Sequence, residues 1–123
     1  TKFQKELSSN KTFSLEDRTF EFARDCRFLV KDLKKTISNI EDGKQLIKSS
    51  GSVGANYIEG NEKLGDKDLK FRIKISRKEA KESEYWLKLL KALNENEMDR
   101  IESLIIEAGE LRKILSTIIN KLK

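Results

Sequence analysis

The feature that most constrains this chain is a run of small residues inside a pattern that otherwise predicts helix. The run reads Ser49-Ser50-Gly51-Ser52-Val53-Gly54-Ala55. Each of its two glycines and three serines costs a helix roughly 0.5 to 1 kcal/mol relative to alanine. The segment can remain helical only if close packing compensates for this loss, so we expect a neighbouring helix to pack tightly against it.

The composition indicates a single all-α domain. A chain of 123 residues is long enough for one hydrophobic core and too short for two. Charged residues make up 38% and hydrophobic residues 37%, and proline is absent. This balance is typical of long surface helices rather than of sheets or disordered chains.

We expect neither a membrane span nor a secretory signal. No run of about 18 apolar residues occurs in the sequence. The N-terminal segment Thr1–Lys5 lacks the apolar stretch of a secretory signal. The chain is therefore expected to be cytoplasmic and to have no membrane partner.

The sequence contains no histidine and a single cysteine, Cys26. Without histidine, Ser-His-Asp and Cys-His nucleophiles and histidine-based zinc or di-iron sites are excluded. One thiol on an apolar helix face is typical of a small core residue and permits no internal disulfide. Glu59, Glu79, Glu82 and Glu84 could in principle gather a hard cation, but the chain has no calcium-loop pattern. We expect no enzyme activity, no cofactor and no metal.

Apolar residues recur at steps of three, four and seven in four segments, which predicts four amphipathic helices. Residues 1–13 are polar and aperiodic, and we expect them to form a tail before a four-helix bundle over residues 14–123. Because the connections are short, consecutive helices should run antiparallel, up-down-up-down. The expected helices cover about residues 14–38, 41–58 and 66–93, and the segment from Asn94–Glu97 to the C-terminus.

Candidate caps mark the ends of these helices. Ser14 offers an N-cap hydroxyl, with the acidic Asp17 three residues later. Gly60 is the expected left-handed stop of the second helix. The carboxylate of Asp66 is expected to cap the third helix.

The helix expected over residues 66–93 carries an excess of positive charge. Eight basic and three acidic residues lie between Lys63 and Lys81, an excess of five that equals the net charge of the whole chain. Most of the basic residues recur at steps of three and four, so they form one stripe of the kind that contacts phosphates, although a solvated face of a lysine-rich helix is the alternative. No aromatic residue is interleaved with the stripe in a stacking pattern, which argues against sequence-specific recognition of a single strand. The candidate nucleic-acid-binding residues are Lys63, Lys67, Lys70, Arg72, Lys74, Arg77, Lys78 and Lys81.

Successive residues of an α-helix are rotated by about 100°. By this rotation, some apolar residues of the first and third expected helices point away from the apolar face that would form the core. A monomeric bundle needs only one apolar face per helix, so a second face predicts burial against another subunit. Trp86 could serve either the core or this interface. The candidate interface residues are Phe20, Phe28, Phe71, Ile75, Tyr85 and Leu89.

Three segments together resemble a known family. Gln45–Gly60 ends in Ala55-Asn56-Tyr57-Ile58-Glu59-Gly60 and is followed by Asp66–Leu69 and by Glu82–Leu87. In this order they resemble the bacterial four-helix-bundle family found in 23S ribosomal-RNA intervening sequences, and the resemblance extends over most of the chain. The motif residues are Asn56, Glu59, Gly60 and Glu82, whereas Gly54, Ala55 and Ser83 depart from the family pattern.

The resemblance implies a ring-like homo-oligomer, commonly a homopentamer. It also implies a distant similarity to the accessory variability determinant of diversity-generating retroelements, which binds nucleic acid and a reverse transcriptase. Asn56 and Glu59, near the end of the second helix, could cap the following loop or present a ligand site, and we favour capping.

Two functions compete at this point. The leading hypothesis is a non-enzymatic oligomeric scaffold that binds RNA, DNA or a ribonucleoprotein through the basic stripe. The alternative is a structural or protein-interaction module, whose stripe only keeps the protein in solution and whose partner docks on the apolar faces.

Overall fold

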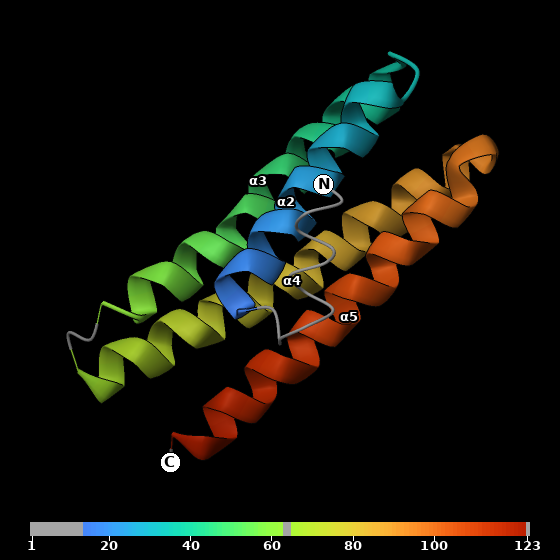
Figure 1. Cartoon of the computed structure of the whole chain (residues 1–123). Coiled ribbons are helices and arrows are strands. Elements are labelled where there is room, and N and C mark those ends of the chain that lie inside the picture. Colours follow the sequence, from blue (N-terminus) through green and yellow to red (C-terminus); the bar gives the residue numbers. More distant parts are fainter. Residues whose placement is uncertain (1–13, 63–64, 123) are drawn as a thin grey trace.

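The computed structural model describes residues 14–62 and 65–122 and consists of four long helices (Figure 1). The predicted tail over residues 1–13 lies outside the described residues, as does Lys63. Within residues 14–62 and 65–122 there is no strand. The elements are α2 (Leu15–Asp32), α3 (Ile37–Gly60), α4 (Asp66–Leu93), a 3-10 turn η1 (Glu95–Glu97) and α5 (Met98–Lys121).

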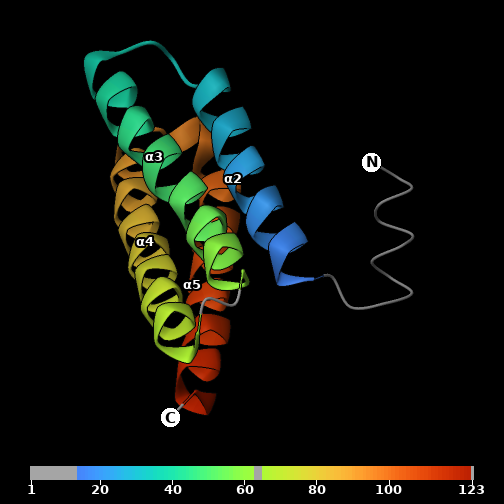
Figure 2. The same cartoon turned by 90° about the vertical axis from the view of Figure 1, so that its left-hand side faces the viewer.

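Consecutive helices run in opposite directions, so the predicted antiparallel four-helix bundle is confirmed (Figures 1 and 2). Helix α4 packs along both α3 and α5. Helix α2 packs mainly against α3 and only lightly against α5. The diagonal pairs, α2 with α4 and α3 with α5, make no close backbone contact.

The core is a column of apolar side chains along the bundle axis. Buried apolar positions recur with the helical period along all four helices. Trp86 and Tyr57 pack against the core and stay partly exposed. The fully buried apolar residues include Cys26, Leu29, Leu46, Val53, Ile73, Ala80, Leu87, Leu90, Ile101, Ala108, Leu111 and Leu115.

Buried serines hold α3 and α4 close together. The hydroxyls of Ser49 and Ser83 lie 2.8 Å apart in a hydrogen bond between the two helices. The Ser76 hydroxyl donates to the backbone carbonyl of Val53 at 2.6 Å. Because each buried hydroxyl has a partner, the small side chains permit close approach without leaving polar atoms unsatisfied. The tight packing predicted from the small-residue run is therefore confirmed.

Glycines play the same part on the side of α3 that faces α2. A Cβ atom added to Gly43 would lie 2.8 Å from Val30 Cγ1, and one added to Gly54 would lie 2.8 Å from Thr19 Oγ1. Real Cβ atoms do not approach other heavy atoms this closely. A larger residue would force the Val30 or Thr19 side chain to shift, so glycine is favoured where α2 crosses α3.

A pair of buried amides joins the two connections at one end of the bundle. Asn39 Nδ2 donates to Asn94 Oδ1 at 3.0 Å, and Asn94 Nδ2 donates back to Asn39 Oδ1 at 2.9 Å. The same amides also donate to the backbone carbonyls of Lys34 and Leu90. The pair thereby fixes the start of α3 against the end of α4.

The predicted boundary between the first two helices is wrong. Helix α2 ends at Asp32 and α3 begins at Ile37, although the apolar spacing continues through both. Leu33 takes an extended backbone conformation, and the Thr36 hydroxyl accepts from Asn39 N as the N-cap of α3. Ile37 consequently lies outside the core, with 84% of its surface exposed.

Two of the predicted caps are also wrong, while Ser14 is confirmed, since it accepts from Asp17 N at 3.1 Å. Gly60 is the last residue of α3 and not a left-handed stop, because a right-handed residue, Asn61, follows it. Asp66 is the first residue of α4 and not its cap. The preceding Gly65 has a φ of 132°, which glycine adopts without strain.

The close approach at Gly54 can be tested by adding one methyl group. Gly54→Ala should lower the free energy of unfolding by about 1 to 3 kcal/mol, because overpacking outweighs the gain in helix propensity. Gly109→Ala is the matched control, since its added Cβ would make only an ordinary contact, at 3.5 Å, with Glu84. That control should raise stability by about 0.5 to 1 kcal/mol. Chemical denaturation followed by circular dichroism measures both, and a Gly54→Ala variant as stable as the parent would contradict the packing described here.

Candidate nucleic-acid interface

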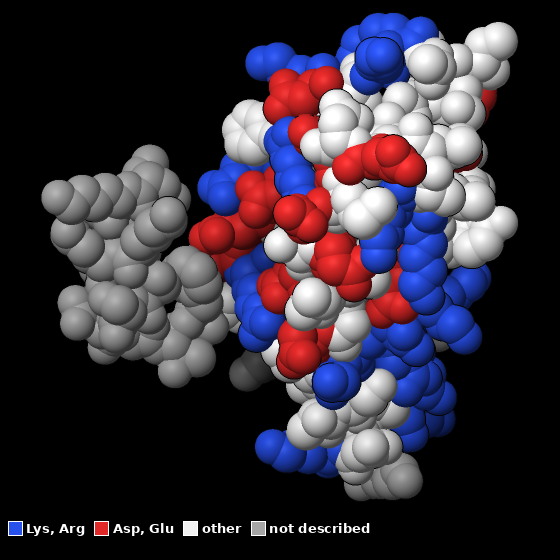
Figure 3. Space-filling model, turned by 90° about the vertical axis from the view of Figure 1, so that its right-hand side faces the viewer, with Lys and Arg blue, Asp and Glu red and all other residues white. Residues whose placement is uncertain are grey.

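A groove with a volume of about 790 Å³ lies between α4 and α5. Six of its nine lining residues are Lys or Arg, and none is Asp or Glu. Figure 3 shows Lys and Arg gathered along one margin of the molecule, whereas both signs of charge are mixed over the middle of the same face. The residues that line this basic groove are Lys74, Arg77, Lys78, Lys81, Gly109, Arg112, Lys113, Ser116 and Thr117.

Helix α4 supplies the part of the basic groove that the sequence predicts. Lys74, Lys78 and Lys81 follow one another at steps of four and three, which places them on one face of the helix. All three side chains are exposed, and none forms an ion pair within the described part of the chain. Arg77 lies toward α5, where its Nη1 donates to Ser116 Oγ at 3.3 Å.

Helix α5 supplies the opposite wall, which the sequence reasoning missed. Arg112 and Lys113 line the groove there, and each is paired with a carboxylate, that of Glu84 and that of Glu110 respectively. Nη1 of Arg112 lies 3.0 and 2.9 Å from the two carboxylate oxygens of Glu84 on α4, and this pair joins the two walls. The signal that could have found this wall is the spacing of Gly109, Arg112, Lys113 and Ser116, which share one face of α5 at steps of three, one and three.

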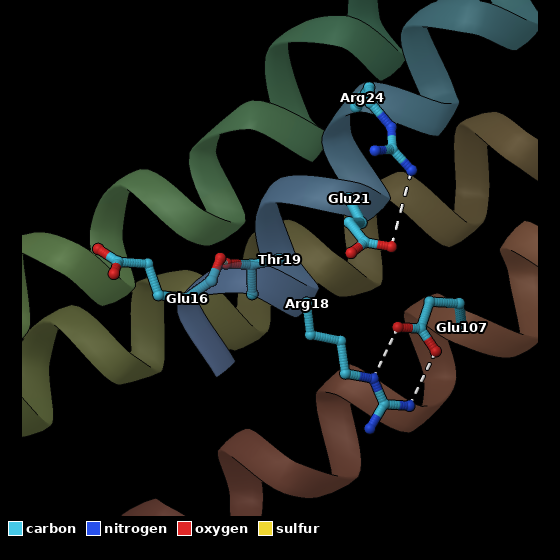
Figure 4. A network of polar contacts seen from close by, with 6 residues as sticks. All are labelled: Glu16, Arg18, Thr19, Glu21, Arg24 and Glu107. Atoms are coloured by element: carbon cyan, nitrogen blue, oxygen red, sulfur yellow. Dashed lines mark hydrogen bonds and ion pairs between the residues drawn. The ribbon is translucent and has the colours of Figure 1, made fainter. Parts of the chain in front are cut away.

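Several charged residues elsewhere on the bundle are paired between helices. Figure 4 shows Arg18 of α2 reaching Glu107 of α5 with two hydrogen bonds of 2.8 Å. Near the other end of α2, Nη1 of Arg100 on α5 lies 2.9 Å from Oδ2 of Asp32. These pairs reinforce the lightly packed contact between α2 and α5. The basic groove differs from this surface because its α4 lysines have no acidic partner of this kind.

A second hollow, of about 420 Å³, adjoins the basic groove and shares Lys78 and Lys81 with it. Tyr85 and Lys88 also line it, and 57% of the surface of Tyr85 is exposed. The ring of Tyr85 packs edge-to-face with Trp86 at a centroid distance of 5.1 Å. Tyr85 lies one helical turn beyond Lys81, the last residue of the predicted stripe, and is followed by Lys88.

The remaining stripe residues divide between two faces of α4. Lys67 and Lys70 continue the lysine face toward the start of the helix by their spacing, but they do not line the groove. Arg72 lies on the α3 side, where its Nη1 donates to Asn56 Oδ1 at 3.2 Å. Asn56 also donates to the carbonyl of Ser52 on its own helix. Through its bond with Arg72 it joins α3 to α4, so it does not cap the loop.

The other motif residues lie near the same α3–α4 contact. Gly60 is buried, and an added Cβ would lie 3.2 Å from side-chain atoms of Arg72 and Leu69. Glu59 and Glu82 are exposed. Burial, and then the neighbouring carboxylate of Glu82, raise the pKa of Glu79 above its ordinary value. Asn56 and Gly60 therefore shape the contact between α3 and α4, whereas Glu59 and Glu82 remain on the surface.

The candidate interface residues occupy two opposite sides of the bundle. Phe71, Tyr85 and the half-buried Leu89 lie on α4, whereas Phe20 and Phe28 are exposed on the diagonally placed α2. Ile75, also half-buried, belongs to the α4 side. Beside Phe20, a groove of about 610 Å³ runs between α2 and α3, with Gly51, Gly54, Ala55 and Ile58 among its lining residues.

Within residues 14–62 and 65–122, the structure contains no cluster of side chains that could form a metal centre. No group of three or more Cys, Asp or Glu side chains in this part of the chain could hold a metal ion. Burial raises the pKa of the Cys26 thiol to about 12, so it is a poor nucleophile. None of the described helices is both long enough and apolar enough to span a membrane.

Comparisons with known proteins identified a family and a solved structure to which this chain is similar. Residues 11–117 match the family model described as the 23S rRNA-intervening sequence protein. A crystal structure from Bacteroides thetaiotaomicron, of a protein with unknown function from the S23 ribosomal protein family, is similar with a TM-score of 0.73 and 33% sequence identity. The similarity covers 86% of this chain and 98% of that one. A comparison with curated proteins gave no match.

Proposed function

The chain belongs to the 23S rRNA-intervening sequence protein family, and we propose that it is a non-enzymatic oligomeric scaffold that binds nucleic acid through the basic groove. The observation that carries this proposal is the lining of the groove, which contains six basic and no acidic residues. Lysine and arginine side chains that neutralise phosphates release bound counterions, and this release supplies most of the affinity of non-specific binding. A nucleic-acid partner also implies a cytoplasmic protein.

The arrangement of the charges favours a bound polyanion over an ordinary solvated face. Lys74, Lys78 and Lys81 on α4 line one wall of the concavity without an ion pair among the described residues, so their fields add where a phosphate chain would lie. On the α5 wall, Glu84 and Glu110 partly offset the charges of Arg112 and Lys113. A surface that only confers solubility mixes both signs of charge, as the paired residues around Arg18 and Glu107 do. An unpaired lysine such as Lys78 keeps its full charge available for phosphate.

A salt titration tests this proposal. Binding of a fluorescent oligonucleotide should weaken linearly in log affinity against log salt between about 50 and about 200 mM. Changing Lys74, Lys78 and Lys81 together to Glu should weaken binding and reduce the steepness of this line by roughly 2 to 3, because about three phosphate contacts are lost. Fluorescence anisotropy measures both quantities.

The matched control changes three exposed lysines elsewhere, Lys31, Lys34 and Lys44, to Glu. It alters the net charge equally but leaves the basic groove intact, so its affinity should stay within a few-fold of the parent. Absence of binding at low salt, or an equal loss in both triple variants, would contradict binding through the groove.

We also propose that the subunits associate head to tail into a closed ring. The apolar side of α4 formed by Phe71, Ile75 and Leu89 lies opposite that of α2, so a contact between copies can bury one side against the other. Such a heterologous contact leaves unburied apolar surface unless the assembly closes into a ring. The number of subunits, five, rests on the family resemblance, which also suggests a reverse transcriptase or another protein as a further partner.

Light scattering tests the assembly. The parent should have about five times the monomer mass of 14.3 kDa at micromolar concentration. Changing Phe71 and Leu89 to Asp should dissociate it, because burial of each large apolar side chain contributes roughly 1.5 to 3 kcal/mol. Ile37→Asp is the control, since this side chain at the start of α3 is 84% exposed and is not one of the candidate interface residues. A stable 14.3 kDa parent would contradict the ring.

A further inference from the structure

We propose that Tyr85 is a stacking platform for an unpaired nucleobase, so that the ligand of the basic groove is single-stranded nucleic acid. This inference rests on the proposed nucleic-acid-binding function and names the class of strand that the groove accepts. It assigns Tyr85 to the ligand site, whereas the sequence placed it in a subunit interface.

The position of Tyr85 connects it to the basic groove. The hollow beside Tyr85 and the basic groove share two lining residues, Lys78 and Lys81, so a strand that follows the groove passes directly to the tyrosine. Lys88 lines the far side of the hollow. Lys81, Tyr85 and Lys88 are separated by four and three residues and therefore share one helix face. Phosphates on either side of a stacked base would each meet a lysine.

The ring of Tyr85 is both accessible and held in place. It keeps 57% of its surface exposed, which is enough for a base to cover it. Its edge-to-face contact with Trp86, at an interplanar angle of 73°, limits its rotation. Trp86 in turn packs against the hydrophobic core. A platform fixed in this way loses little side-chain entropy when a base stacks on it.

The acidic residues of the hollow do not block such a strand. Glu84 is engaged by Arg112, which offsets its charge. Glu82 is exposed at the rim and repels phosphate locally. Its repulsion directs the phosphates toward the lysine side of Tyr85. The base, which carries no charge, is the part of the nucleotide suited to lie over the ring.

An unpaired strand uses this arrangement, whereas a duplex does not. In a duplex the bases already stack on one another and present no free face to a protein side chain. A duplex would meet the lysines through its phosphates but gain nothing from Tyr85. Stacking on an aromatic side chain is also tolerant of sequence, because every base has a flat face. The site therefore predicts a preference for single strands without a strong sequence preference.

The test compares strands and variants by fluorescence anisotropy. The probes are oligo(U) RNA and oligo(dT) DNA, each about 20 nucleotides long, and a duplex of oligo(dT) with oligo(dA) of the same length. Tyr85→Leu should weaken binding of both single strands by about 5- to 100-fold and leave duplex binding nearly unchanged. Tyr85→Phe keeps the ring and should bind as the parent does.

Phe28→Leu is the matched control, because Phe28 is an aromatic residue on α2 with a similar exposed fraction, 51%, and does not line the groove, and because leucine keeps an apolar side chain at the proposed ring contact. It should not change affinity for any probe. Light scattering on every variant separates the ligand role from the interface role. A Tyr85→Leu variant that dissociates and loses single-strand and duplex binding equally would overturn the inference.

The inference and the proposed function fail in different ways. If single strands bind with the expected salt dependence but Tyr85→Leu binds as tightly as the parent, the stacking role is wrong and the basic groove remains. If the duplex binds as tightly as either single strand, the preference for unpaired bases is likewise wrong. If no probe binds at low salt, both proposals fall together.

Discussion

The close contact between α3 and α4 is the constraint on which the rest of the structure depends. Ser76 and Ser83 face α3, where Ser76 donates to the Val53 carbonyl and the Ser83 hydroxyl lies 2.8 Å from that of Ser49. At about 100° per residue, a residue two positions away points roughly 200° from them. Lys74 and Lys81 are therefore directed away from α3 and onto the outer surface beside α5. The small residues that permit packing thus also orient the charged face.

The sequence predicted the helices and the core more completely than the helix ends. Positions such as Leu87 and Leu111 were predictable because burial repeats with the helical period. The break between α2 and α3 was not, since Ile37 continues the apolar spacing. That break depends on the Thr36 cap and on the amide pair of Asn39 and Asn94, which are 55 residues apart in sequence. The spacing of apolar residues along the chain does not reveal a contact between residues so far apart in sequence.

For the same reason, the sequence predicted only the α4 part of the candidate site. The lysines of α4 form a stripe that spacing alone reveals, whereas Arg112 and Lys113 become part of the site only when α5 packs alongside. Arg72 has the same charge as its neighbours, yet its contact with Asn56 removes it from the groove. Tyr85 was assigned to an interface because the sequence shows an exposed aromatic but not which lysines surround it. Whether a residue belongs to the site therefore depends on what packs around it, even among residues of one helix.

Lysine acetylation measured by mass spectrometry tests the central claim most directly, because it reports which lysines a bound strand covers. The protein would be treated with a small excess of acetylating reagent, with and without a saturating single strand of about 20 nucleotides. The groove hypothesis predicts protection of lysines on both walls, with unchanged reactivity at the far side of the bundle. Equal protection everywhere, or protection confined to the far side, would contradict it. The groove lysines are Lys74, Lys78, Lys81 and Lys113, and the reference lysines are Lys34 and Lys44.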